Sequence, residues 1–452
     1  MGNKQIKTIN KSLNSNEKNK ENEANDNFEF FTDMPDDLII WIFQFIDHSR
    51  LLDCAVCCSR FYDLALDPML WKETSISVGK NINQNTIISL AKKIPHLRGI
   101  RIKKCSIQNT IEFFQAIKKN LPNINNIELN SITDQQDRDV AKYMSELDKL
   151  ISVSIIGNKI SIFADEFSMI PQLESLNLLS NNLNAFPTKV FPLLRILKLD
   201  INHFVQIPEQ IDQIFPNIEH LFMNYNSIVS IPDSIQNLSK LRTLEIRSNK
   251  ISGLPLSFAN LSDLRVFNAG SNPFREFPKI LCSLRQLQVI SLNNCGLREI
   301  PPEISELREL LTLNLANNYL KEFPIELCSL GKLSLLDLRI NKIDSIPLEI
   351  RNMTSLQELI IFGNSLISLP FSISELHLYR LLLQGNSILN LPDEFGNPPL
   401  GDTLIELDIR ENPIQVLNPS FLKFRKLVRL LIKKGIEVPK EIVENLTTFK
   451  TD

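Results

Sequence analysis

The sequence predicts an α/β fold, a solenoid with a parallel sheet along its concave face, preceded by a small all-α helical module. The solenoid follows from an apolar frame ending in asparagine, which returns about every 23 residues, as in Leu241-x-x-Leu244-x-Ile246-x-x-Asn249. The helical module follows from residues 31–72, which lack this frame and have apolar residues at helical spacing. We therefore expect a disordered leader over 1–29, the helical module over 30–76, the solenoid over 77–439 and a C-terminal tail over 440–452.

The first 30 residues are rich in Lys, Asn and Glu and contain no apolar stretch of the kind found in secretory signal peptides. This composition is typical of a disordered chain. In the following segment, Asp33 and Pro35 form a plausible helix start. A helical unit of about forty residues buries little core by itself. We therefore expect it to dock on the solenoid, on a partner, or on both.

Each repeat is located by the residue at its asparagine position. These residues are Asn158, Asn181, Asn202, Asn226, Asn249, Asn272, Cys295, Asn318, Asn341, Asn364, Asn386 and Asn412. Their successive spacings are 23, 21, 24, 23, 23, 23, 23, 23, 23, 22 and 26 residues. Upstream, cruder copies place Cys105 and Ile132 in this position with spacings of 27 and 26 residues, and a last copy has Gly435 there. Degenerate copies at both ends are typical of the capping repeats of a solenoid.

Each copy of the frame predicts a short strand whose alternate side chains point into the core. Successive strands would pair in parallel, and the buried asparagine amide would both donate to and accept from backbone groups of neighbouring repeats. Cys295 can do this only weakly, so we expect a local softening there. A proline follows the last apolar position of most repeats, as at Pro255 and Pro278, and Ile235 and Leu238 would fill a convex layer of short helical turns.

This pattern resembles the intracellular leucine-rich repeats, and specifically their 23-residue subclass with proline after the last apolar position. The resemblance covers roughly residues 94–439. It implies a horseshoe-shaped leucine-rich-repeat solenoid that acts as a binding surface for other proteins. The subclass includes scaffolds similar to the Ras-group-related repeat proteins, which bind small GTPases.

Recognition is expected on the strand side chains that point out of the concave face. Most of these positions are polar, whereas Phe222, Ile360, Phe362 and Leu382 are apolar. Exposed apolar clusters mark interaction sites, so we expect a hot spot at Ile360, Phe362 and Leu382, with incidental surface apolars as the alternative. The candidate substrate-binding residues are Phe222, Glu245, Arg247, Asp337, Arg339, Ile360, Phe362, Arg380, Leu382 and Arg410. The acidic and basic residues two apart on one strand should neutralise one another and help to select a partner.

The helical module resembles an F-box. Met34-Pro35 stands where that family has Leu-Pro, Val56-Cys57 is followed by Phe61, and Leu70-Trp71 matches the closing pair. The resemblance implies binding to the adaptor subunit of an SCF-type cullin–RING ubiquitin ligase, and through it to the cullin. The residues that would face the adaptor are Pro35, Leu38, Ile42, Leu51, Leu52, Val56, Cys57 and Trp71. The alternative is that the same residues form a helical cap over the first repeat.

Composition and motifs argue against other functional classes. The formal net charge of −3 gives no basic field for nucleic acid or an anionic membrane, and every apolar run is too short to span a bilayer. The seven cysteines and five histidines form no metal-binding motif, and no nucleotide-binding or nucleophile motif occurs. The sequence therefore predicts no enzyme, no metal site and no cofactor. Free thiols suggest a reducing compartment, so we expect a cytoplasmic or nuclear protein, or one in the host cytosol if its source is an intracellular bacterium.

Two functions stay open at this point. The first is a substrate-recognition subunit of an SCF-type ubiquitin ligase, which would hold a protein target on the concave face. The second is a non-catalytic signalling scaffold of the Ras-group repeat type, with residues 31–72 as a structural cap.

Overall fold

The computed structural model describes residues 34–46, 51, 54, 57–71, 75–78, 84–105, 107–132, 140–436, 438, 440 and 448–451. The leader expected over residues 1–29 lies outside these residues. The chain divides into two compact units. Unit 1 comprises Met1–His203 and Gln213–Asn217, and unit 2 comprises Phe204–Asp212 and Ile218–Asp452. The division falls within the short helix α10 (Ile211–Ile214).

Among the described residues of unit 1, the short helices α3, α5 and α6 precede the first strand, and repeats follow. Its elements are α3 (Asp36–Phe43), α5 (Ser59–Ala65), α6 (Pro68–Trp71), β1 (Ser75–Val78), α7 (Gln84–Lys93), β2 (Gly99–Lys103), α8 (Thr110–Asn120), β3 (Asn126–Asn130), α9 (Val140–Ser145), β4 (Ser152–Ile156), η1 (Asp165–Met169), β5 (Ser175–Asn177) and β6 (Ile196–Lys198). Strands β1 to β6 pair in parallel, each with the next in the sequence. The helices before β1 and the parallel strands after it confirm the predicted fold class.

Unit 2 consists of repeats whose strands alternate mainly with 3-10 turns. Its strands are β7 (His220–Phe222), β8 (Thr243–Glu245), β9 (Val266–Asn268), β10 (Val289–Ser291), β11 (Thr312–Asn314), β12 (Leu335–Asp337), β13 (Glu358–Ile360), β14 (Arg380–Leu382), β15 (Glu406–Asp408), β16 (Arg429–Ile432) and β17 (Thr448–Thr451). Between its strands the described residues form η2 (Asp233–Asn237), η3 (Leu256–Asn260), η4 (Lys279–Ser283), η5 (Pro302–Glu306), η6 (Ile325–Ser329), η7 (Leu348–Asn352), η8 (Phe371–Glu375), α11 (Leu400–Thr403) and η9 (Pro419–Lys423). Strand β17 lies in the segment expected as a tail, and it pairs in parallel with β16.

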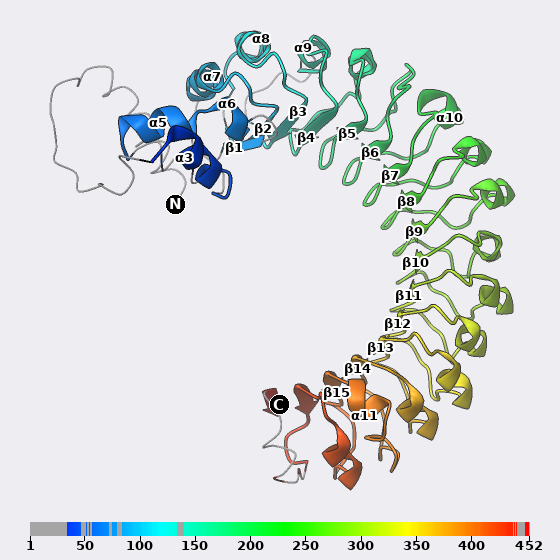
Figure 1. Ribbon diagram of the computed structural model, residues 1–452. Coiled ribbons are helices and arrows are strands. Elements are labelled where there is room, and N and C mark those ends of the chain that lie inside the picture. The colour runs from blue at the N-terminus through cyan, green and yellow to red at the C-terminus, as the bar shows by residue number, and fades with distance from the viewer. Residues whose placement is uncertain are drawn as a thin grey trace. The chain divides into compact units, whose positions relative to one another are not determined.

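Within the repeats of each unit, the strands follow one another on one side, and the helices or turns of those repeats lie on the opposite side (Figure 1). The length of each repeat decides whether an α-helix or a 3-10 turn forms on that side. The 27-residue repeat from Cys105 to Ile132 contains the 11-residue helix α8, whereas the 23-residue repeats have room only for five-residue 3-10 turns such as η5. A 3-10 turn advances further per residue than an α-helix, so it spans the convex side with fewer residues.

The asparagine ladder has the predicted form. Nδ2 of Asn318 donates to the carbonyl oxygens of Leu292 in the preceding repeat and Leu315 in its own, both at 2.9 Å. Oδ1 of Asn318 accepts from the backbone N–H groups of Cys295 and Leu297 at 3.0 Å. One buried amide therefore satisfies backbone groups of two repeats, which would otherwise be left unpaired in the core.

Candidate functional site

The helical module holds α3 and α5 together through Arg60. Its Nε donates to Oδ1 of Asp36 at 2.9 Å, and its Nη2 donates to the same oxygen and to the carbonyl oxygen of Met34. The rings of Phe43 and Phe61 pack edge to face, with centroids 5.4 Å apart. These contacts fix the direction in which α3 presents its outer face.

That outer face is apolar. Leu38, Trp41 and Phe45 follow one another at helical spacing, and their exposed fractions are 43%, 55% and 74%. The rings of Trp41 and Phe45 pack edge to face, with centroids 4.9 Å apart. We call Leu38 and Trp41 of α3, together with Phe45 in the turn that follows it, the α3 face. An exposed apolar surface that includes a tryptophan is typical of a protein-binding site.

The residues predicted to face an adaptor differ from one another in solvent exposure. Pro35, Leu38 and Cys57 are exposed, Ile42 is half-buried, and Leu51 is buried. Leu52 and Val56 lie outside the described residues, as does the side chain of Trp71, whose backbone ends α6. Sequence reasoning missed Trp41 as a site residue. The spacing of three and four residues between Leu38, Trp41 and Phe45 is the signal that could have identified it.

The module also contacts the first repeats within unit 1. Nζ of Lys93, in α7, donates to the hydroxyl oxygen of Tyr62 at 3.1 Å and lies 5.7 Å from the centre of that ring. A cation near an aromatic ring adds a modest attraction. The α3 face remains exposed beside this contact.

On the concave face of unit 2, adjacent strands bring the predicted cluster together. Ile360 on β13 pairs in register with Asp337 on β12 and Leu382 on β14, and Leu382 pairs with Asp408 on β15. Ile360 and Leu382 are only 8% and 7% exposed, so the expectation that they are exposed was wrong. Parallel strands lie about 4.8 Å apart, so long side chains on neighbouring strands cover one another.

The more accessible part of this cluster lies two residues beyond Ile360. Phe362 is half-buried, and Cζ of Arg339 lies 5.8 Å from the centre of its ring. Phe222, on β7, is also half-buried, but five strands separate it from β13. The structure therefore joins Ile360, Phe362 and Leu382 with Arg339 and leaves Phe222 apart.

Two of the three predicted charge pairs form. Arg339 Nε lies 3.4 Å from Oδ2 of Asp337, and Arg410 Nη2 lies 2.8 Å from Oδ2 of Asp408. The third prediction was wrong: Glu245 accepts from Nδ2 of Asn224 at 2.9 Å, and the guanidinium of Arg247 lies 6.0 Å from the ring of Tyr225. Burial raises the pKa of Asp337, although the backbone N–H and the charge of Arg339 oppose this. Asp337 is thus a carboxylate poorly solvated by its site.

Charged side chains on neighbouring strands form a row beside the cluster. Arg380 is 3.5 Å from Glu358 and 3.0 Å from Glu406, and Glu406 is 3.1 Å from Arg429. These residues alternate in sign along β13 to β16, and each of the two arginines has a carboxylate partner. The row is close to neutral, so it makes no strong local field.

The cysteines of the solenoid are poor nucleophiles. Burial raises the pKa of Cys282 and Cys328 to about 12 and that of Cys295 to about 11. Among the residues that the structure describes, no three His, Cys, Asp or Glu side chains are grouped so that they could hold a metal ion. None of the helices within the described ranges is long and apolar enough to cross a membrane.

Comparison with protein families gives three matches. Residues 275–371 match a leucine-rich repeat region, residues 192–251 match a leucine rich repeat, and residues 31–77 match an F-box-like family. No curated protein matches the chain.

Solved structures share the fold. A leucine-rich-repeat protein of Leptospira interrogans is 25% identical with a TM-score of 0.63, over 86% of this chain and 97% of that one. The leucine-rich-repeat ectodomain of a plant receptor kinase from Arabidopsis thaliana, solved in complex with a protein named Casparian strip integrity factor 2, is 21% identical with a TM-score of 0.59, over 90% of this chain and 51% of that one. An internalin from Listeria monocytogenes is 18% identical with a TM-score of 0.51, over 69% of this chain and 88% of that one.

The fold and these matches define the class: this is a leucine-rich-repeat solenoid protein. More specifically, the chain combines an F-box-like domain, which contains the α3 face, with the leucine-rich repeats that follow it.

Proposed function

We propose that this protein is a substrate-recognition subunit of an SCF-type cullin–RING ubiquitin ligase and works in the cytoplasm or the nucleus. The observation that supports this most is the α3 face, an exposed apolar surface on an F-box-like domain that precedes a solenoid. The Arg60–Asp36 ion pair holds that face in place. In this proposal the α3 face, with Pro35 and Cys57 near it in the sequence, binds the adaptor subunit.

The protein itself performs no chemistry in this proposal. Phe362 and Arg339, the accessible part of the cluster, hold a protein target on the concave face, and the charged row around Arg380 helps to choose it. The ligase would then act on a target kept close to it, which raises the effective concentration of the reacting groups.

The adaptor contact is tested by co-purification of the full-length chain with the SCF adaptor subunit. Replacing Pro35 and Leu38 together by Ala should abolish co-purification, because both residues are exposed on the module. Leu256→Ala is the matched control, since Leu256 is 85% exposed on η3. If the double variant still co-purifies as wild type does, the proposal is wrong.

The target contact is tested separately. Phe362→Ala combined with Arg339→Ala should lower the recovery of proteins cross-linked to the solenoid, as quantified by mass spectrometry. Leu348→Ala on η7, where Leu348 is 47% exposed, is the control away from the strands. Equal recovery for the cluster variant and the control would show that Phe362 and Arg339 do not contact the target.

The alternative function is a scaffold that binds a small GTPase, with the helical module as a cap. The Lys93–Tyr62 contact favours this reading, because it attaches the module to α7. The scaffold predicts capture of a GTP-loaded small GTPase by the full chain and weaker capture of the GDP form. It also predicts that the variant carrying Pro35→Ala and Leu38→Ala behaves as wild type in that assay.

A further inference from the structure

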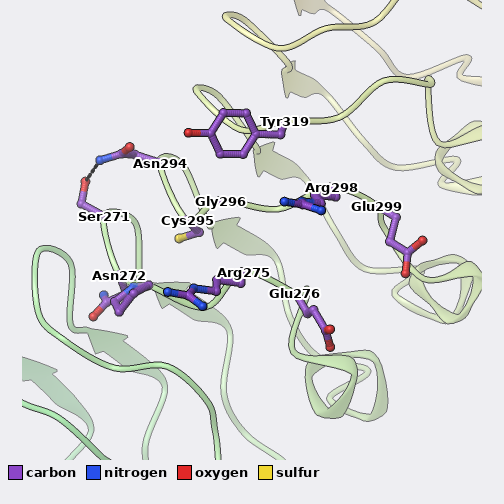
Figure 2. Close-up of a pocket in the computed structure, with 11 residues that line it drawn as sticks. Ser271, Asn272, Arg275, Glu276, Asn294, Cys295, Gly296, Arg298, Glu299 and Tyr319 are labelled. Atoms are coloured by element: carbon purple, nitrogen blue, oxygen red, sulfur yellow. Dashed lines mark hydrogen bonds between the residues drawn. The ribbon is translucent and has the colours of Figure 1, made fainter.

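A cavity of about 800 Å³ opens beside strands β9, β10 and β11, within unit 2. The loops that leave these three strands line it, with Arg275, Arg298, Asn294, Cys295 and Tyr319 among the lining residues (Figure 2). This volume lies in the range of small-molecule sites. The cavity shares no lining residue with the cluster at Ile360, and the α3 face belongs to unit 1.

The cavity lies where the asparagine ladder is interrupted. In the regular repeats the backbone N–H two residues after one asparagine donates to the next asparagine, as Ile251 N does to Oδ1 of Asn272 at 2.9 Å. Cys295 has no amide oxygen, and the equivalent group, Phe274 N, donates instead to the carbonyl oxygen of Asn272 at 3.0 Å.

The loop after Asn272 follows a different path as a result. Arg275 adopts a positive φ of 64°, which is uncommon for a residue other than glycine. Its N–H donates to the carbonyl oxygen of Cys295 at 2.9 Å. Strained backbone of this kind often marks a functional site. Here it places Arg275 on the wall of the cavity.

The charges in the cavity are arranged by sign. Figure 2 shows the guanidinium groups of Arg275 and Arg298 extending toward Asn272 and Gly296, whereas Glu276 and Glu299 extend away from them. Within the described part of the chain, neither arginine forms an ion pair, in contrast to Arg380 with its two carboxylate partners.

Two polar side chains complete this side of the cavity. Nδ2 of Asn294 donates to Oγ of Ser271 at 3.3 Å, so both groups are held near the opening. Tyr319 is 55% exposed and adds a phenol and a ring face.

We propose that this cavity binds a phosphate monoester, held between the guanidinium groups of Arg275 and Arg298. Guanidinium groups bind phosphate oxygens through paired hydrogen bonds, and they keep their charge at all physiological pH values. Asn294 and Tyr319 donate to the remaining oxygens, and the ring of Tyr319 covers the ester group. The site binds and does not react, since burial keeps the Cys295 thiol protonated.

The proposal goes beyond the proposed ligase function and stands without it, because none of its residues belongs to the helical module. The monoester could be a small metabolite or a phosphorylated side chain of a protein. Three titrants separate these sources: inorganic phosphate, free O-phosphoserine, and a peptide with one central phosphoserine, with the unphosphorylated peptide as control.

The test is isothermal titration calorimetry of the full-length chain. We expect saturable binding of O-phosphoserine, weakened at least about tenfold in the variant carrying Arg275→Gln and Arg298→Gln, since losing such charge-assisted contacts removes more than the 1.4 kcal/mol that a tenfold change represents. The matched control carries Arg265→Gln and Arg308→Gln, which removes two exposed charges outside the cavity and should bind as wild type does. Cys295→Asn, which restores the ladder residue, should also weaken binding.

Tighter binding of the phosphopeptide than of O-phosphoserine would assign the site to a phosphorylated protein, and the reverse would assign it to a small metabolite. The proposal is overturned if no monoester binds saturably, if only inorganic phosphate binds, or if the cavity variant and the control bind alike.

Discussion

Sγ of Cys295 lies 3.5 Å from the carbonyl oxygen of Ala269, where the neighbouring repeats place an asparagine amide nitrogen about 2.9 Å from the equivalent oxygen. A thiol is a weak donor and provides no amide oxygen, so the repeat keeps only part of the ladder. The structure shows a rearranged loop at this position, and the local softening expected from the sequence stays a prediction.

Cys295→Asn should therefore stabilise the protein. The restored side-chain amide oxygen, which accepts from backbone N–H groups, and a stronger donor should raise the free energy of unfolding by about 1 kcal/mol, as measured by urea denaturation. Cys282→Asn is the contrasting variant. Cys282 is buried in η4, on the convex side, so an amide there should lower stability by about 1–3 kcal/mol. If both variants shift the free energy of unfolding in the same direction, the effect is not specific to the ladder position.

Asn318→Ala should be strongly destabilising. It removes the groups that pair with Leu292, Leu315, Cys295 and Leu297, so the expected loss is more than about 3 kcal/mol in urea denaturation. Asn352→Ala, at an exposed position of η7, should change stability by less than about 0.5 kcal/mol. Similar losses for the two variants would show that the ladder does not hold the repeats together.

The pH dependence of stability should contain a contribution from Asp337. Because burial raises its pKa above the ordinary value of 3.8, the folded protein binds this proton more tightly than the unfolded chain. The free energy of unfolding therefore falls as pH rises from that value through the raised pKa. Asp337→Asn keeps an acceptor for the Arg339 N–H and removes the titration. The variant should thus gain stability relative to wild type as pH rises through this window.

The control for this measurement is Asp263→Asn, at an exposed position. This variant removes one exposed carboxylate, so a change common to both variants would reflect the loss of a charge alone. A difference between Asp337→Asn and wild type that stays constant from pH 3 to pH 7 would contradict the assignment.

The repeat frame was sufficient to predict the strands, their parallel pairing and the asparagine ladder, because a fixed spacing places equivalent residues side by side. It could not predict which concave side chains are exposed. The burial of Ile360 and Leu382 depends on the side chains of adjacent strands, where Asp337 and Asp408 stand beside them in register. The failure of Glu245 and Arg247 to pair has a similar cause, since Asn224 and Tyr225 of the previous repeat offer closer partners.

The cavity beside Cys295 was also beyond sequence reasoning. The sequence shows cysteine in place of asparagine at position 295. The path of the loop, however, depends on the acceptor that Phe274 N uses, which is the carbonyl oxygen of Asn272. In the helical module, Trp41 was overlooked because the resemblance directed attention to the positions of the family motif. The spacing from Leu38 to Phe45 shows the same surface without that resemblance.

The most direct test of the central claim is the affinity of the full-length chain for the SCF adaptor subunit, measured by isothermal titration calorimetry. Replacing Trp41 and Phe45 by Ala should weaken binding at least about 30-fold, because buried aromatic side chains at interfaces contribute 2 kcal/mol or more. Leu256→Ala should bind as wild type does, and both variants should keep the wild-type circular dichroism spectrum. Unchanged affinity in the Trp41 and Phe45 variant would contradict the account and leave the helical module as a cap of the solenoid.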